Sequence, residues 1–112
     1  MDAVNRRAFL GKAKQIRLGD SYWKVLSSLG PPTVEDHRGT DWPRPPILYH
    51  EMDWYLTIWE RGSVNEEHDE YVSVIFDEDK QLVREVAIFL IPRSLGDPTT
   101  RWGKWPDAGV GR

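Results

Sequence analysis

The string GDSYWKVLSSLGPP carries the start, the apolar face and the end of one complete helix, from residue 22 to 29. No other stretch of the chain specifies its structure as fully. Ser21 precedes this helix, and its hydroxyl oxygen can accept a hydrogen bond from a free backbone N–H of the first turn. Val25 and Leu29 lie four residues apart and therefore share one face. Gly30 can adopt a positive φ after the last turn, and the prolines that follow cannot continue the helix. The sequence therefore predicts a short helix that packs through one apolar side.

A second helix is predicted over residues 3–16, where Phe9, Ala13 and Ile16 recur at helical spacing. Basic residues occupy many of the remaining positions, and Gly11 weakens the pattern because glycine has a low helix propensity. A short break separates this segment from the next helix. Two short helices joined by a tight turn form a helical hairpin.

Alternating apolar residues predict strands in the second half of the chain. The expected strands cover residues 47–50, 54–59, 71–76 and 82–91. Trp54 is the expected core residue of the second strand, because it shares a face with Leu56 and Ile58. The acidic turn at residues 77–81 is expected to join the last two strands as a hairpin.

Prolines and glycines mark the irregular parts of the chain. Residues 30–46 contain five prolines and are expected to form a surface loop, because proline lacks an N–H and restricts the residue before it. Residues 93–112 are predicted to be a loose tail, apart from Trp102 and Trp105. The sequence therefore predicts a single α+β domain over residues 1–92, followed by this tail.

The expected architecture is an N-terminal helical hairpin packed on a three- to four-stranded antiparallel sheet, a two-layer sandwich. A sheet with alternating faces needs a cover on its apolar side, and the two helices supply it. The last predicted strand is apolar on both sides. Part of the second face is therefore also expected to be covered, by the tail or by a partner.

Composition and charge exclude several classes of protein. The chain has 112 residues, 39% hydrophobic and 29% charged, which suits one globular domain. The absence of cysteine excludes disulfides, thiolate metal sites and a cysteine nucleophile. The net charge of −3 combines two opposed regions: residues 1–24 have a net charge of +4, and residues 51–79 have a net charge of −9. The first helix could contact phosphates, but the acidic region argues against nucleic-acid binding.

The helix string resembles the SmpA/OmlA (BamE-like) family of small outer-membrane assembly lipoproteins and the related β-lactamase-inhibitor-like domains. Their shared pattern is an aliphatic residue, glycine, a Ser/Thr helix cap, a valine and then Leu-Gly-x-Pro, matched here by Leu18-Gly19, Ser21, Val25 and Leu29-Gly30-Pro31-Pro32. The hairpin matches at Phe76-Asp77 and Leu82-Val83, so the similarity covers about residues 14–91. The chain departs from the family in lacking a lipobox cysteine and a signal peptide. The resemblance implies a small non-catalytic domain that binds proteins.

Localisation depends on whether the chain is complete. Arg6-Arg7-Ala8-Phe9-Leu10 resembles a twin-arginine export motif, but the residues that follow are not the apolar segment that such a signal needs. We expect a cytoplasmic protein if the chain is complete, and an envelope or periplasmic one if an export signal was removed. No apolar run approaches the roughly 20 residues that span a bilayer.

No catalytic residue, metal site or cofactor is predicted. The three histidines, His37, His50 and His68, lack a zinc-binding spacing and are expected to be exposed. Residues 77–79 lack the ligand spacing and the glycine of a calcium loop. The remaining candidates for acid–base catalysis are three carboxylates that would have to meet across a cleft: Glu51, Asp53 and Glu60.

The expected function is non-enzymatic binding or scaffolding of a protein partner whose identity and stoichiometry are open. Aromatic residues opposite Trp54 are the predicted anchors of the binding face, and acidic residues border it. The predicted binding residues are Tyr55, Thr57, Trp59, Glu66, Glu67 and Asp69. The alternatives are a small ligand-binding or regulatory domain with an aromatic pocket, and an enzyme that uses the central carboxylates. An exposed aromatic patch favours the first function, a concave pocket the second, and convergent carboxylates with shifted pKa values the third.

Overall fold

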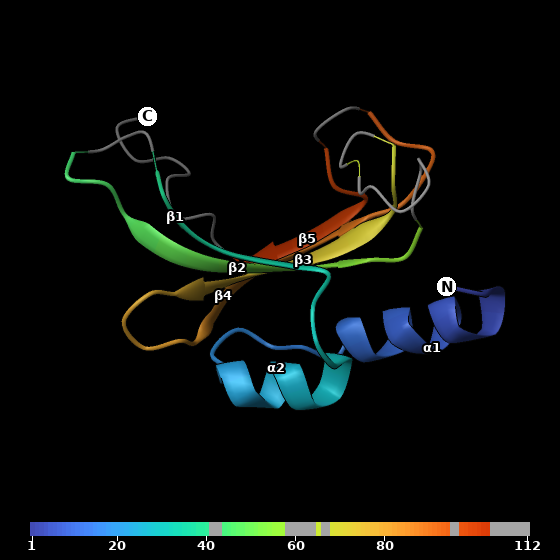
Figure 1. Ribbon diagram of the computed structural model, residues 1–112, viewed down its shortest axis with the longest axis horizontal. Helices are drawn as coiled ribbons and strands as arrows, with labels where there is room; N and C mark the ends of the chain where they lie inside the picture. Colours follow the sequence, from blue (N-terminus) through green and yellow to red (C-terminus); the bar gives the residue numbers. More distant parts are fainter. Residues whose placement is uncertain (41–43, 58–64, 66–67, 95–96, 104–112) are drawn as a thin grey trace.

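The structure of this protein is a computed structural model that describes residues 1–40, 44–57, 65, 68–94 and 97–103. Two helices lie on one side of an antiparallel sheet, and the sheet has five strands among the described residues (Figure 1). The helices are α1 (Ala3–Ala13) and α2 (Tyr22–Leu29). The strands are β1 (Val34–Gly39), β2 (Leu48–Tyr55), β3 (Tyr71–Asp77), β4 (Val83–Phe89) and β5 (Thr100–Gly103). Each strand pairs with the next in the order β1-β2-β3-β4-β5. The predicted α+β class is confirmed.

The helix from residue 22 to 29 forms as predicted. Ser21 caps it, because its Oγ accepts a hydrogen bond of 3.1 Å from the backbone N–H of Lys24. Val25 and Leu29 are buried, and Gly30 ends the helix with a φ of 77° and a ψ of −171°, a conformation that favours glycine. Local sequence was therefore sufficient to predict α2.

The two helices only roughly form the predicted hairpin, since they lie one after the other beneath the sheet (Figure 1). α1 ends at Ala13, earlier than predicted, although Ile16 is still buried. The connection between the helices is tied to the β3–β4 hairpin by backbone hydrogen bonds. Gly19 N donates to Val83 O over 2.9 Å, and Tyr22 N donates to Gln81 O over 3.0 Å. These bonds hold the start of α2 against the end of the sheet.

β1 forms inside the stretch that is predicted to be a loop. The prolines of residues 30–46 flank this strand and do not interrupt it. β1 is an edge strand with five exposed residues, so it has no apolar alternation that the sequence could reveal. The register of its antiparallel pairing places His37 opposite His50. The expected count of three to four strands is therefore too low.

β2 and β5 also differ from the predicted strands. β2 runs without a break from Leu48 to Tyr55. The sequence predicts two separate strands in this region, because Glu51 and Asp53 interrupt the apolar pattern. β5 lies within the predicted tail and pairs with β4. Trp102 on β5 packs against the core, and its Nε1 donates to Ile16 O over 3.0 Å.

The main core lies between the helices and the sheet, and it includes Trp54 as predicted. Its buried members on the strands are Met52, Trp54, Val72, Val74, Phe76, Val83, Val86 and Ile88. A smaller cluster on the other face of the sheet contains Tyr71, Ala87 and Phe89, with Tyr55 packed against it. Neither described helix is long and apolar enough to cross a membrane.

Candidate functional site

A pocket of about 450 Å³ opens where the start of α2 meets β1, β2 and the turn after β3. We call it the ring pocket, because four of its side chains carry aromatic rings. Its lining residues are Ser21, Tyr22, Trp23, Glu35, His37, His50, Lys80 and Gln81. They come from four separate parts of the chain, which the cap of α2 and the pairing of β1 with β2 bring together.

His50 forms the buried wall of the ring pocket, and only 3% of it is exposed. Its Nδ1 lies 2.7 Å from Gln81 Oε1, and its Nε2 lies 2.6 Å from Glu35 Oε2. Gln81 Nε2 donates to Glu78 O over 2.8 Å, so Gln81 Oε1 is the atom that faces His50 and accepts a hydrogen bond from His50 Nδ1–H. Both nitrogens of His50 are therefore engaged, which leaves neither of them to act as a general base.

The rings of the pocket are stacked. His37 lies over His50 with ring centroids 4.3 Å apart and an interplanar angle of 13°. Tyr22 stacks on His50 at 5.4 Å, and its hydroxyl donates to Glu35 Oε2 over 3.2 Å. Burial and the charge of Glu35 raise the pKa of Tyr22, so its hydroxyl remains a donor. The pocket wall is thus fixed by stacking and by hydrogen bonds.

His37 is the exposed histidine of the pocket. Its Nδ1 lies 3.1 Å from each carboxylate oxygen of Glu78, and 61% of its side chain is exposed. His37 Nε2 makes no hydrogen bond with the residues that the structure describes. This nitrogen is available to a bound molecule, while Glu78 orients the ring.

Trp23 stands at the mouth of the ring pocket, with 72% of its surface exposed. Its ring meets the Tyr22 ring edge to face, with centroids 5.1 Å apart. A tryptophan that is held by a neighbouring ring but largely exposed offers a large apolar surface for contact. The sequence analysis did not assign the Tyr22-Trp23 pair to a site.

The predicted binding residues that the structure describes, Tyr55, Thr57 and Asp69, do not line this pocket. Tyr55 stacks on Tyr71 with ring centroids 4.8 Å apart. Thr57 Oγ1 donates to Asp69 Oδ1 over 3.0 Å, and Asp69 is fully buried. Trp59, Glu66 and Glu67 lie outside the described residues. The structure therefore pairs Thr57 with Asp69 and places Tyr55 in a ring stack, and the predicted face stays a prediction.

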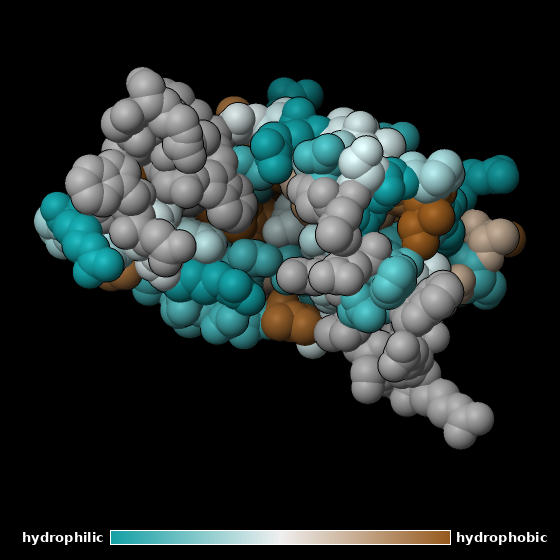
Figure 2. All heavy atoms as spheres, turned by 90° about the horizontal axis from the view of Figure 1, so that it is seen from above, coloured by the Kyte–Doolittle hydropathy of each residue, from teal (hydrophilic) through white to brown (hydrophobic). Residues whose placement is uncertain are grey.

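Figure 2 shows the molecule from the side opposite the helices. The described surface there is mostly coloured as hydrophilic, and the hydrophobic residues appear as separate spots. The sheet face on this side carries Tyr55, Tyr71 and Phe89, and the last two are buried. The exposed ring of Trp23 belongs instead to α2, on the helix side of the sheet.

Two of the central carboxylates, Glu51 and Asp53, lie on this same far face of the sheet. Asp53 is 7% exposed, and its Oδ1 has no hydrogen-bond partner. Burial, together with neighbouring Glu51, raises the pKa of Asp53 to about 8. Glu60 lies outside the described residues. In the described part of the chain, no group of three or more histidines and carboxylates is arranged to hold a metal ion.

The expectation that all three histidines are exposed is wrong for His50. His50 alternates with Met52 and Trp54, so all three side chains lie on the side of β2 that faces the helices. His37 and His68 are exposed as expected. The signal that could have identified a buried His50 was this alternation, once the strand was known to begin at Leu48.

Comparison with known proteins found no matching family model, no matching curated protein and no matching solved structure.

Proposed function

We propose that this protein is a non-enzymatic binding module that docks onto a protein partner through Trp23 and the ring pocket. The observation that carries the proposal is a tryptophan that is 72% exposed at the mouth of a ready-made pocket. Tryptophan and tyrosine dominate the energetically important positions of protein interfaces. Resemblance to the SmpA/OmlA family implies the same class of function and remains a prediction.

The rigidity of the pocket wall supports binding. His50 is held by Glu35 and Gln81, and its ring stacks with those of His37 and Tyr22. A wall that is already ordered loses little conformational entropy when a partner binds. The engaged nitrogens of His50 also favour recognition over proton transfer. His37 Nε2 and the Lys80 side chain supply polar contacts at the rim.

The test places a photoreactive amino acid at position 23 and, as the control, at Val4, which is 78% exposed on α1. Both proteins are irradiated in an extract of the native host, and the cross-linked products are identified by mass spectrometry. We expect position 23 to yield a defined protein adduct that position 4 does not yield. In a second arm, Trp23→Ala should remove capture of that protein and Val4→Ala should preserve it. Equal adducts at the two positions, or full capture by Trp23→Ala, would contradict the proposal.

A small ligand is the second candidate, because the pocket volume of about 450 Å³ lies within the range of small-molecule sites. An NMR screen with aromatic fragments separates the two functions. Fragments that shift the His37 and His50 signals, in a protein that forms no adduct at position 23, would favour a ligand-binding or regulatory domain. The binding face predicted from the sequence is tested in the same extracts with a Trp59→Ala variant.

A further inference from the structure

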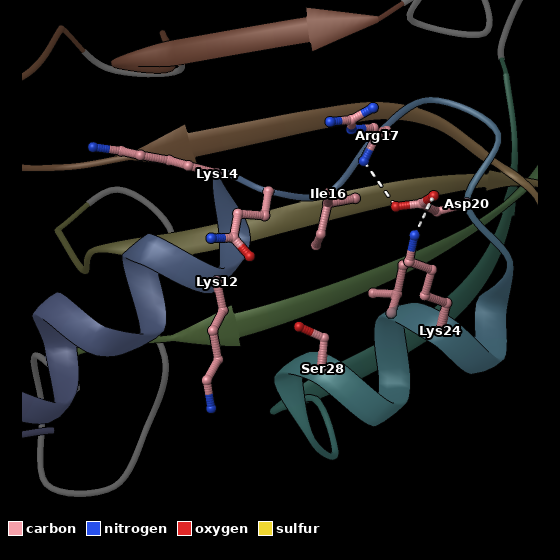
Figure 3. A pocket seen from close by; sticks show the side chains of 9 residues that line it. Lys12, Lys14, Ile16, Arg17, Asp20, Lys24 and Ser28 are labelled. Atoms are coloured by element: carbon pink, nitrogen blue, oxygen red, sulfur yellow. Dashed lines mark hydrogen bonds and ion pairs between the residues drawn. The ribbon is translucent and has the colours of Figure 1, made fainter.

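A second cleft, of about 600 Å³, lies between the end of α1 and α2 and shares no lining residue with the ring pocket. Figure 3 shows it from close by. We call it the basic cleft, because four cationic side chains line it: Lys12, Lys14, Arg17 and Lys24. Lys12 comes from α1, Lys24 comes from α2, and Lys14 and Arg17 lie between the helices.

Asp20 is the one acidic residue among those that line the basic cleft, and its carboxylate is already engaged. Its Oδ2 accepts from the backbone N–H of Arg17 over 2.9 Å, and its Oδ1 lies 3.2 Å from Lys24 Nζ. Burial alone would raise the pKa of Asp20, but these two contacts lower it, so the group stays ionised and bound to them. Asp20 therefore forms its ion pair with Lys24, and the charge of Arg17 also helps to lower the pKa of Asp20.

The other three cations form no ion pair with the residues that the structure describes. These are Lys12, Lys14 and Arg17, and they leave the basic cleft with a net charge of +3 once Asp20 is counted against Lys24. The whole chain has a net charge of −3. The basic cleft is thus a local concentration of positive charge on an otherwise acidic protein, and such a field attracts anionic groups.

The cations are spread along the cleft. In Figure 3, Lys12, Lys14 and Arg17 extend in different directions and do not converge on one point. A single phosphate would need donors that converge on it, whereas separated cations suit several negative charges along an extended chain. Ile16 and Val25 also line the cleft and are almost completely buried, at 6% and 1% exposure. Their side chains therefore offer little surface to a bound molecule, and the cations are the accessible groups of the cleft.

We propose that the basic cleft binds an extended acidic peptide segment of a protein partner. Aspartate or glutamate side chains of the segment pair with Lys12, Lys14 and Arg17. The net charge of −3 on the whole chain favours a short acidic segment over a long polyanion such as nucleic acid. The proposal does not depend on the ring pocket.

The test measures fluorescence anisotropy with a labelled peptide, Glu-Glu-Leu-Asp-Glu-Leu-Glu-Glu, at low salt. The critical variant is Lys12→Gln/Arg17→Gln, and the matched control is Arg7→Gln/Arg44→Gln, which removes two exposed cations elsewhere. We expect the critical variant to weaken binding by about tenfold or more and the control by less than about threefold.

Three results would overturn the proposal. Equal losses in the two double variants would show attraction to charge in general. Labelled oligothymidylate of similar length that binds as tightly as the peptide would identify a nucleic-acid site. Absence of peptide binding to the wild-type protein at low salt would exclude the site itself. Circular dichroism of each variant checks that the fold is intact. Each of these results is independent of the cross-linking at position 23 that tests the proposed function.

Discussion

His50 places a polar side chain on the helix-facing side of the sheet, next to the ring of Phe76. This position is tolerated because both ring nitrogens have partners, Glu35 Oε2 at 2.6 Å and Gln81 Oε1 at 2.7 Å. Buried polar groups are costly when a partner is removed, since the remaining atoms lose both water and hydrogen bond. His50 therefore joins β1, β2 and the β3–β4 turn into one wall of the ring pocket.

His50→Ala is expected to lower the free energy of unfolding by about 2–3 kcal/mol, because it leaves the partner oxygens unsatisfied and opens a cavity. His37→Ala is the matched control, since its side chain is 61% exposed, and its loss should stay below about 1 kcal/mol. Urea denaturation followed by circular dichroism measures both. Equal losses would contradict the role assigned to His50.

Asp53 makes the stability of the protein dependent on pH. Its pKa rises from the ordinary 3.8 to about 8 in the folded protein. Between these values the folded state holds a proton that the unfolded state has lost, so the free energy of unfolding falls as pH rises from about 4 to about 8. Asp53→Asn should remove this slope and raise the melting temperature at pH 8 relative to wild type.

Asp79→Asn, in the exposed turn after β3, is the control for this experiment. Its melting temperature should change with pH in parallel with that of the wild-type protein. Thermal melts between pH 4 and pH 9 provide the comparison. If the melting temperature of Asp53→Asn still falls with rising pH as steeply as that of wild type, another group causes the pH dependence.

α1 is attached to the sheet by few side chains, and an ion pair is prominent among them. Within α1, only Leu10 and Ala13 are buried. Arg6 forms a two-point contact with Glu70, from Nε to Oε1 over 2.9 Å and from Nη2 to Oε2 over 3.0 Å. Glu70 Oε2 also accepts from Ile91 N over 2.9 Å. The hydrogen bond from Arg6 lowers the pKa of Glu70 against the opposing effect of burial.

Arg6→Gln is expected to loosen α1, with faster amide hydrogen exchange along the helix and a loss of stability of about 1–2 kcal/mol. Arg7→Gln changes an exposed neighbour and should alter neither measurement. The contribution of Glu70 is present above the ordinary carboxyl pKa of 4.5 and is lost as pH falls through its lower folded value. Exchange rates in α1 that are the same for Arg6→Gln and Arg7→Gln would refute this account.

The sheet as a whole divides the molecule into two unlike sides. The helix side holds the main core, the ring pocket and the basic cleft, while the far side holds the ring stack and Asp53. The binding face was expected on the far side, yet both pockets proposed above lie beside α2.

The edge strands β1 and β5 set the width of the sheet, and the pairing of β5 with β4 depends on a glycine with a positive φ. Gly103 has a φ of 103°, and an added Cβ would lie 2.1 Å from Arg84 O.

Gly103→Ala is therefore expected to disrupt the pairing of β5 with β4 and to expose Trp102, with a loss of stability of about 2 kcal/mol or more. Gly11→Ala is the matched control. Gly11 lies in α1 with open space around it, so the change should stabilise the protein by about 0.5–1 kcal/mol. Denaturation curves and the Trp102 indole signal in NMR spectra measure both variants. An unshifted Trp102 signal in Gly103→Ala would rule out this role.

Much of the fold could be predicted from the sequence, because its helices and strands have recognisable local residue patterns. The cap at Ser21, the apolar pair Val25 and Leu29, and the stop at Gly30 defined α2 within a few residues. β3 and β4 were also predictable, since Val72, Val74 and Phe76 alternate towards one core. In these segments the conformational preference and the hydrophobicity of each residue agree with the secondary structure and the burial that it has in the fold.

The sites could not be predicted in the same way. His37 lies on an exposed edge strand, and its contact with Glu78 spans 41 positions of the sequence. The basic residues were recognised as a charged helix, but the cleft between them exists only once α1 and α2 are placed. Neighbours in sequence were sufficient to predict α2, β3 and β4. The pairing of edge strands, the burial of His50 and both pockets were decided by tertiary structure, because they depend on contacts between residues far apart in the chain.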